Sequence, residues 1–193
     1  MALTVSISRK MNWKVLDSKY ILQKPWMTVR QDRVKLPTGV VIPEYYVFEY
    51  PAWVNVIAIT AEGQFVLVRQ YRHGIGRETW EIPAGVVETT DKTPLAGAQR
   101  ELLEETGFGG GEWRELMRVS GNAAAYNNIT YCYLAKGVRQ IAEQSLDAGE
   151  DLVWSLHDEK DVKMMLQEGE FVQSLMAAPL WKYFATPNGS GRL

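Results

Sequence analysis

Three glutamates set about one helical turn apart constrain this chain more than any other feature. Glu101, Glu104 and Glu105 occupy positions i, i+3 and i+4 in the run RELLEETG, which ends at Gly107. On a helix these positions share one face, so the three carboxylates would lie close together. An acidic, solvated helix face is the alternative reading for three glutamates taken alone. Carboxylate oxygens are also the ligands that hard divalent cations prefer, so the spacing predicts a helix that carries a metal site.

The ends of this helix can be predicted from local signals. Thr93 is a suitable N-cap because its hydroxyl can accept a backbone N–H, and Pro94 fits the first helical position that follows. Gly107 stands where a left-handed C-cap belongs. Only Arg100 lies in the same turn to relieve the repulsion between the glutamates.

Length and charge exclude several classes of protein. The chain has 193 residues, 46% of them hydrophobic and 23% charged, which is the composition of a soluble globular protein. A net charge of −2 without a Lys/Arg cluster argues against a nucleic-acid or membrane partner. The first residues lack the apolar core of a signal peptide, and no run reaches the length of a membrane span. We therefore expect a cytoplasmic protein, in which the single Cys132 is a small apolar residue of a strand.

The remaining pattern predicts an α+β fold with a mixed sheet and helices packed on it. Residues 13–47 contain three extended segments separated by turns, which favours a small antiparallel β subdomain over residues 1–50. A buried strand at residues 54–60, a hairpin turn and a strand at residues 65–72 begin a second domain, residues 51–186. Residues 187–193 are rich in Pro, Asn, Gly and Ser and are expected to form a flexible tail. Further strands are expected at residues 79–83, 113–120, 129–134 and 152–156, and helices at residues 158–168 and 171–184.

One segment carries a resemblance to a known family. Gly85 followed by residues 100–108, RELLEETGF, resembles the Nudix box of hydrolases that cleave nucleoside diphosphates linked to another moiety. Residues 69–72, RQYR, and residues 81–85, EIPAG, resemble its ADP-ribose pyrophosphatase and nucleoside-diphosphate-sugar hydrolase branch. The resemblance implies a Nudix-type α/β/α sandwich. It also implies a homodimer whose subunits exchange their N-terminal strands.

The box departs from the family pattern in one respect. The stretch from Gly85 to Arg100 is one residue longer than usual, and Asp91 stands where the family has Glu. The extra residue falls in the turn of residues 88–92, so the spacing of the helical glutamates is unaffected. The loop of residues 121–126 also lacks the proline that ADP-ribose hydrolases of the family usually carry, which weakens the case for ADP-ribose against other nucleoside diphosphate sugars.

The residues favour Mg²⁺ or Mn²⁺ as the cofactor. Cleavage of a diphosphate needs charge neutralisation and an acidified water, which divalent ions supply. Two histidines and one cysteine make zinc improbable. Glu101 and Glu105 are the predicted direct ligands, and Glu104 is predicted to complete a second metal position. The resemblance implies a further ligand, the backbone carbonyl of Ala84, next to the close turn at Gly85.

The resemblance also implies an acid from a downstream loop that accepts a proton from the water. Within residues 144–151 we predict Glu150 for this role and Asp147 as the second choice, with a solvated surface loop as the alternative. Arg72 is predicted to pair with a phosphate, because its fork matches that partner.

Trp26 is the predicted platform for a nucleobase, with Tyr45 or Tyr46 behind it. The expected reaction is hydrolysis of a nucleoside diphosphate sugar, ADP-ribose included, to a nucleoside monophosphate and a sugar phosphate. A nucleoside triphosphate pyrophosphatase and a catalytically silent Nudix-like nucleotide-binding module are the alternatives.

Overall fold

The chain divides into two compact units. The computed structural model describes residues 11–186. The first unit contains the chain up to Tyr50 together with Asn122–Asn127, and the second contains Pro51–Gly121 and the chain from Asn128 onward. The expected tail at residues 187–193 lies outside the described residues. Within residues 11–186, no helix is long and apolar enough to cross a membrane.

The first unit is the antiparallel sheet that the sequence predicts. Strand β1 (Lys14–Lys24) pairs with β2 (Met27–Lys35), and β2 pairs with β3 (Val41–Glu49). Phe48 donates its backbone N–H to the carbonyl of Ala125 at 2.7 Å, which fastens the inserted segment to β3. Arg30 crosses the sheet between Asp32 and Glu49. Many large apolar side chains of this unit remain exposed in the single chain, among them Val15, Tyr20, Ile21, Trp26 and Met27.

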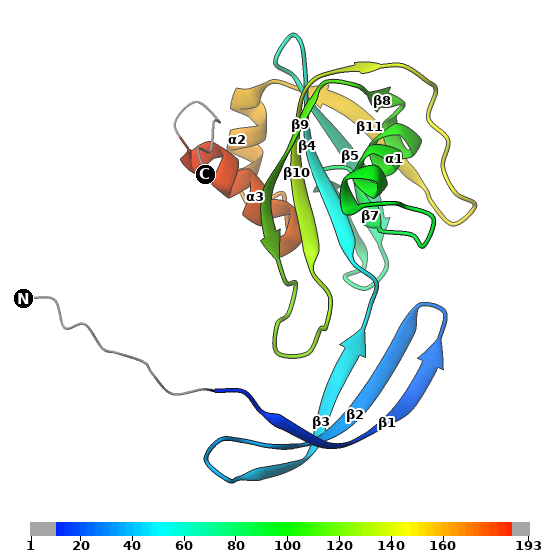
Figure 1. Cartoon of the computed structure of the whole chain (residues 1–193). Coiled ribbons are helices and arrows are strands. Elements are labelled where there is room, and N and C mark those ends of the chain that lie inside the picture. Colours follow the sequence, from blue (N-terminus) through cyan, green and yellow to red (C-terminus); the bar gives the residue numbers. More distant parts are fainter. Residues whose placement is uncertain (1–10, 187–193) are drawn as a thin grey trace, which may run out of the picture. The chain divides into compact units, whose positions relative to one another are not determined.

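The second unit is built on an eight-stranded mixed sheet, whose central path runs β11-β5-β4-β10-β8 (Figure 1). The pairing of β4 with β10 is parallel, whereas the other strand pairs of this sheet within residues 11–186 are antiparallel. The sheet contains β4 (Trp53–Thr60), β5 (Phe65–Arg72), β6 (Arg77–Glu81), β7 (Ala84–Val86), β8 (Phe108–Gly109), β9 (Glu112–Val119), β10 (Thr130–Gln140) and β11 (Leu152–His157). The helices are α1 (Pro94–Thr106), α2 (Glu159–Gln167) and α3 (Ser174–Ala185).

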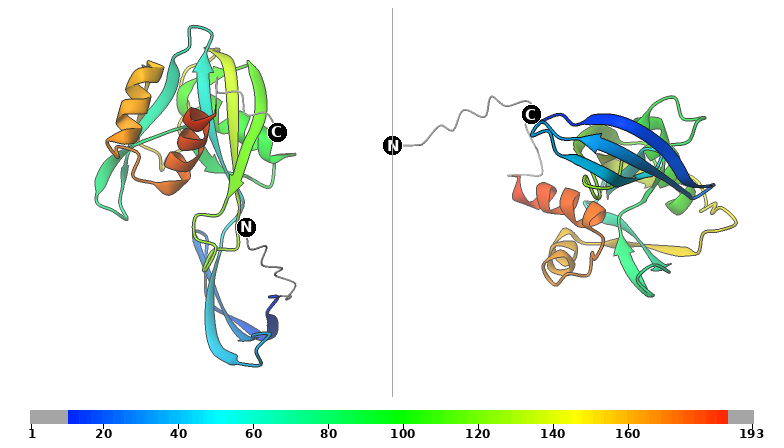
Figure 2. Two further views of the ribbon diagram at one scale, coloured as in Figure 1. Left: turned by 90° about the vertical axis from the view of Figure 1, so that its left-hand side faces the viewer. Right: turned by 90° about the horizontal axis from the view of Figure 1, so that it is seen from below.

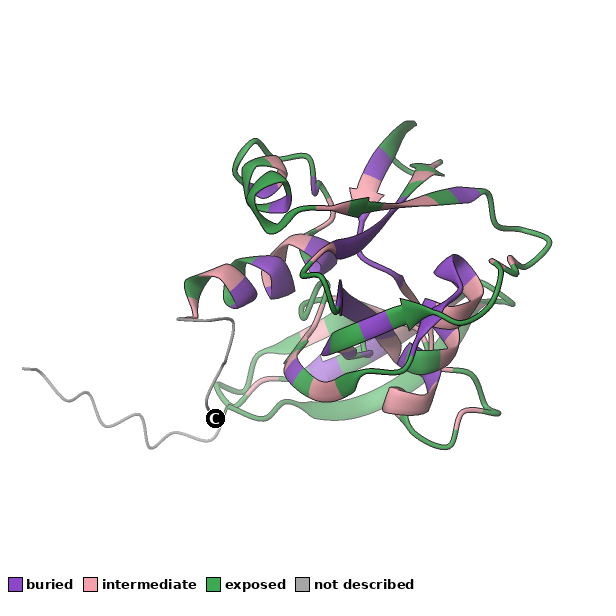
Figure 3. Ribbon diagram, turned by 90° about the horizontal axis from the view of Figure 1, so that it is seen from above, coloured by how far each residue is buried: buried purple, intermediate pink, exposed green. Residues whose placement is uncertain are grey.

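Helices cover both faces of this sheet (Figures 1 and 2). Successive side chains of a strand point to opposite faces, and β4 is apolar on both. Val54 and Val56 pack with Leu102 of α1, whereas Ile57 packs with Leu180 of α3. Buried residues therefore lie on the facing sides of the sheet and helices, as Figure 3 shows. The predicted α+β layering with a mixed sheet is confirmed.

Two non-aliphatic residues, Asn55 and Cys132, are buried in the central strands β4 and β10. Asn55 is fully buried, and its side-chain amide donates to the carbonyl of Leu175 at 2.7 Å, which ties β4 to α3. Cys132 is buried beside it in β10, and burial raises the pKa of its thiol to about 12. A thiol of that pKa stays protonated, in agreement with the role of a small apolar residue.

Several elements differ from the sequence-based expectation: β8 was not expected, and α3 begins at Ser174, three residues later than expected. Residues 84–86 form the short strand β7 instead of opening a loop, because Gly85 lies opposite Val54 and continues the sheet. Strand β10 extends to Gln140, six residues beyond the expected end at residue 134. Backbone hydrogen bonds to β4, β8 and β9 hold the polar second half of β10 in the sheet. A pattern of apolar residues does not predict such a polar strand segment.

Candidate metal and diphosphate site

Helix α1 has the predicted ends. The Thr93 hydroxyl accepts the backbone N–H of Ala96 at 3.1 Å, and Pro94 occupies the first position of the helix. Gly107 is left-handed with φ 76°, and its N–H donates to the carbonyl of Leu103. A side chain at Gly107 would also place its Cβ 2.2 Å from the carbonyl oxygen of Ala142. The helix is therefore held in a fixed register at both ends.

Two glutamates of α1 meet a third from a distant loop. Carboxylate oxygens of Glu101, Glu105 and Glu150 all lie within 4.8 Å of one another. Glu101 and Glu105 are buried, whereas Glu150 is exposed. Burial raises the pKa of Glu101 to about 7, and it raises the pKa of Glu105 well above its ordinary value. Closely spaced buried carboxylates with raised pKa values are an arrangement that a cation would relieve.

The approach of Glu150 depends on the loop between β10 and β11. The last carbonyls of a helix lack partners within the helix, and this loop supplies donors for them. The Gln144 side chain donates to the carbonyl of Glu105 at 2.6 Å, and the backbone of Ser145 donates to that of Glu104 at 2.8 Å. Asp147 and Glu150 close a turn, in which the Glu150 N–H donates to the Asp147 carbonyl at 2.9 Å. The loop is thus fastened to the C-terminal end of α1, and this fastening brings Glu150 beside Glu105.

The turn before α1 touches the cluster directly. The backbone N–H of Ala84 donates to Glu105 Oε2 at 3.0 Å. A Cβ atom built on Gly85 would lie 2.1 Å from Cδ and Oε1 of Glu101. Only glycine leaves room for that carboxylate at this position.

Arg100 organises the outer side of the helix. Its guanidinium donates to the carbonyl of Val86 at 2.8 Å, to Glu104 at 2.7 Å and to both carboxylate oxygens of Asp91, the closer at 3.1 Å. It also lies 3.0 Å from Glu101 Oε1. The carboxylate of Glu104 is therefore engaged by Arg100 and does not join the cluster of three.

Asp91 keeps this arrangement in spite of the longer turn. It accepts the backbone N–H of Glu88 at 2.9 Å, and the Arg100 guanidinium holds the pKa of its carboxyl below the ordinary value. Its carboxylate packs so closely on α1 that a Cβ at Gly97 would lie 2.8 Å from Asp91 Oδ2. The extra residue is absorbed in the turn, and Asp91 still reaches Arg100.

Arg72 lies beside the cluster with a partner that sequence reasoning missed. Its Nε donates to Glu81 Oε1 at 2.7 Å and its Nη2 to Glu81 Oε2 at 2.5 Å. The Glu81 carboxylate is fully buried, whereas 41% of the Arg72 side chain is exposed. The hydrogen bonds to Glu81 raise the pKa of Arg72, and the charges of Glu81, Glu105 and Glu150 raise it further. Glu81 is buried among the donors Arg72, Thr79 and Gln70, and only the register of β5 and β6 reveals this pairing.

The predicted base-binding residues belong to the first unit. Trp26 lies in the turn between β1 and β2 and is 86% exposed. Tyr45 contacts Trp13 edge to face, and its hydroxyl donates to the carbonyl of Ala124. The Tyr46 hydroxyl donates to Glu44 at 2.9 Å. Their role toward a nucleobase stays a prediction.

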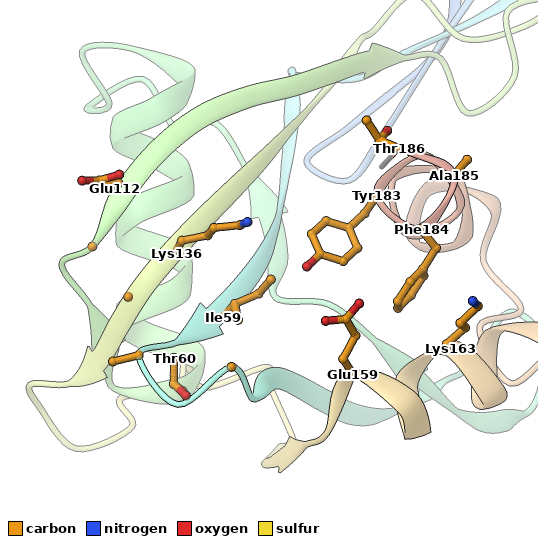
Figure 4. A pocket seen from close by; sticks show the side chains of 14 residues that line it. Ile59, Thr60, Glu112, Lys136, Glu159, Lys163, Tyr183, Phe184, Ala185 and Thr186 are labelled. Carbon is orange, nitrogen blue, oxygen red and sulfur yellow. The ribbon is translucent and has the colours of Figure 1, made fainter. Parts of the chain in front are cut away.

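A separate cavity has a volume of about 1110 Å³. Figure 4 shows side chains that line it. Ile59 and Thr60 at the end of β4 line it together with residues of β10, α2 and α3. The cluster lies instead near the beginning of β4, where Val54 pairs with Gly85. None of the three clustered glutamates lines this cavity.

Fold and site together define an α/β/α protein with a carboxylate site suited to a hard divalent cation. The NUDIX domain family model matches residues 49–175, and the model of the nucleoside diphosphate sugar hydrolase N-terminal domain matches residues 13–48. The chain therefore belongs to the Nudix family of hydrolases.

Relatives of known description agree with this assignment. The chain is 28% identical over 162 residues to an ADP-ribose pyrophosphatase of Mycobacterium tuberculosis, covering 83% of this chain and 78% of the relative. It is 34% identical over 125 residues to a methanol dehydrogenase activator of Bacillus methanolicus, covering 65% and 66%. An ADP-ribose pyrophosphatase of Bacillus subtilis is 31% identical over 118 residues, covering 61% and 62%. The crystal structure of an ADP compounds hydrolase superposes with a TM-score of 0.81 over 96% of this chain and 100% of that chain, at 19% identity, which establishes the shared fold.

Proposed function

We propose that this protein hydrolyses the diphosphate bond of a nucleoside diphosphate sugar, with ADP-ribose as the first candidate, to a nucleoside monophosphate and a sugar phosphate. The observation that carries the proposal is the cluster of Glu101, Glu105 and Glu150 beside Gly85 and Arg72. The match of residues 13–48 to the N-terminal domain of nucleoside diphosphate sugar hydrolases favours this substrate class over nucleoside triphosphates. ADP-ribose takes precedence because two of the relatives are ADP-ribose pyrophosphatases.

The donor set fits Mg²⁺ or Mn²⁺. The cluster offers oxygen ligands alone, which suits these ions, and its raised pKa values reflect carboxylates whose ionisation a bound cation would favour. We propose that Glu101 and Glu105 hold the cation together with the carbonyl of Ala84, and that Glu150 stays free to act on the water. Glu104 stays a predicted ligand of a second cation. To bind that cation, its carboxylate would have to leave Arg100. The bound cation supplies charge neutralisation on the phosphates and acidifies a water.

Protein groups have distinct tasks in this scheme. Glu150 is the exposed member of the cluster, so its carboxylate is the one that can accept a proton from the attacking water. Arg72 binds a phosphate oxygen through the N–H groups that Glu81 leaves free. Arg100 and Asp91 orient Glu101 from behind and touch no substrate.

We also propose that the active species is a homodimer whose first units form the interface and contribute to binding of the base. The exposed apolar side chains of β1 and β2 support association, because monomeric proteins rarely expose so many on one small sheet. Trp26 is the proposed base-stacking residue. Light scattering of the purified protein tests the dimer. Replacement of Trp26 by Ala should raise KM for ADP-ribose without changing the response to Mg²⁺.

A substrate panel tests the proposed reaction. ADP-ribose, other nucleoside diphosphate sugars and nucleoside triphosphates would be incubated with Mg²⁺, and the products separated by anion-exchange chromatography. Release of nucleoside monophosphate and sugar phosphate supports the proposal. Exclusive turnover of triphosphates would assign the chain to triphosphate pyrophosphatases. Tight binding without turnover would assign it to the silent binding modules.

A further inference from the structure

We propose that Glu81 is a positioning residue, which holds the Arg72 guanidinium at the edge of the acidic cluster so that its free N–H groups face the substrate diphosphate. The inference rests on the proposed function, since it concerns the substrate's phosphates. It assigns a role to a buried acid that has no part in metal binding.

The contacts fix the guanidinium at two points. Glu81 accepts Nε of Arg72 through one carboxylate oxygen and Nη2 through the other, at 2.7 and 2.5 Å. This bidentate geometry sets both the position and the plane of the guanidinium. The Nη1 hydrogens and the second hydrogen of Nη2 are left for another acceptor.

Glu81 is itself held in place. It comes from β6, where its backbone lies opposite Val68 of β5. The Thr79 hydroxyl donates to Glu81 Oε1 at 2.7 Å, and Gln70 approaches Oε2 at 3.5 Å. A buried carboxylate is costly unless it is paired and hydrogen-bonded. The Glu81 carboxylate therefore favours the conformation in which Arg72 is bound to it.

The pair lies within electrostatic reach of the cluster. The charge of Glu81 contributes to the raised pKa of Glu105, and Glu105 and Glu150 both act on Arg72. The partly exposed Arg72 and the acidic cluster therefore lie within range of each other's charge. A diphosphate bridged to a cation at the cluster would meet the free Nη donors of Arg72.

The same hairpin offers a matched control. Arg69 and Glu78 also pair between β5 and β6, but at 3.5 Å and with both side chains largely exposed. Exposed pairs of this kind contribute little to stability or function. A Glu78→Gln variant removes an acid of the same strands without touching the Arg72 pair.

The experiment is a double-mutant cycle over wild type, Glu81→Gln, Arg72→Ala and the double variant. The readouts are kcat/KM for ADP-ribose with Mg²⁺ and, by calorimetry, Kd for the non-hydrolysable α,β-methylene analogue of ADP-ribose. Loss of one charge-assisted hydrogen bond corresponds to about a tenfold loss, so we expect Glu81→Gln to weaken both quantities about tenfold in the wild-type background. In the Arg72→Ala background the same change should have less than about a twofold effect. Glu78→Gln should match wild type.

Each outcome decides the inference. Wild-type values for Glu81→Gln, or an equal loss in both backgrounds, would overturn it, because Glu81 would then act independently of Arg72. If Glu81→Gln does not fold, Glu81→Asp takes its place in the cycle, since it keeps the charge and shortens the reach. A wild-type protein without turnover would contradict the proposed function, while the Kd cycle would still decide the role of Glu81.

Discussion

Replacement of Gly85 by Ala should disturb the acidic cluster and leave the fold intact. The new Cβ would lie 2.1 Å from Cδ and Oε1 of Glu101 and 2.4 Å from Oε2, whereas ordinary contacts begin at 3.4 Å. The Glu101 carboxylate must therefore move by about 1 Å or more. Because it is the end of a flexible side chain, the fold can accommodate the shift at small cost. The reaction is more sensitive to this shift than the fold is, since a misplacement of about 1 Å at a reacting centre can cost about 100-fold in rate.

We therefore expect Gly85→Ala to unfold near the wild-type temperature and to lose about 100-fold in kcat/KM, with a higher Mg²⁺ concentration at half-maximal rate. The measurements are steady-state kinetics over a Mg²⁺ titration and calorimetric unfolding. Gly74→Ala is the matched control, because a Cβ at Gly74 meets nothing within 4 Å. Wild-type kinetics in Gly85→Ala would refute the assignment of Glu101 to the site.

The remaining predictions concern neighbours of the cluster. Asp91→Asn should lower kcat about tenfold, because the loss of the Asp91 charge releases Arg100. If Asp91 instead bound substrate, the variant would show a higher KM. Burial raises the pKa of Glu101 from 4.5 to about 7, so the folded metal-free protein binds a proton that the unfolded chain releases as pH rises through this window. The unfolding temperature in EDTA should thus fall between about pH 5 and about pH 8. Addition of Mg²⁺ should raise the unfolding temperature more at about pH 8 than at about pH 5. An equal rise at both pH values would contradict this prediction. Glu150→Gln should lower kcat with little change in KM for ADP-ribose, and a wild-type-like kcat would exclude Glu150 as proton acceptor.

Local signals were sufficient to predict α1. The cap at Thr93, the proline after it and the glycine at the C-terminal end each act on adjacent backbone groups, so their effect does not depend on the rest of the fold. The strands with apolar runs were predicted for the same reason, since β4 and the first half of β5 are buried on both faces. The second half of β10 is polar, and its ladder partners come from three other strands.

Spacing alone predicts only those site residues that are close in sequence, whereas Glu150 and Arg72 were expected from the family resemblance. Glu101 and Glu105 share a helix face by spacing alone. Glu150 joins them because Gln144 and Ser145 bind the end of α1, and such contacts between distant segments leave no periodic signal. The bond of Arg72 to Glu81 depends on the register of two strands, which a sequence without aligned relatives does not specify.

The most direct test of the account is turnover by Glu105→Gln. Glu105 is buried at the centre of the cluster and keeps the N–H of Ala84 as a partner, so the amide can retain the fold while removing the charge. ADP-ribose hydrolysis with saturating Mg²⁺ would be measured for wild type and Glu105→Gln at equal concentrations of folded protein. We predict that wild type releases AMP and ribose 5-phosphate in equal amounts and that the variant is slower by about 1000-fold or more. A wild-type-like kcat in folded Glu105→Gln would contradict the claim that these carboxylates carry the reaction.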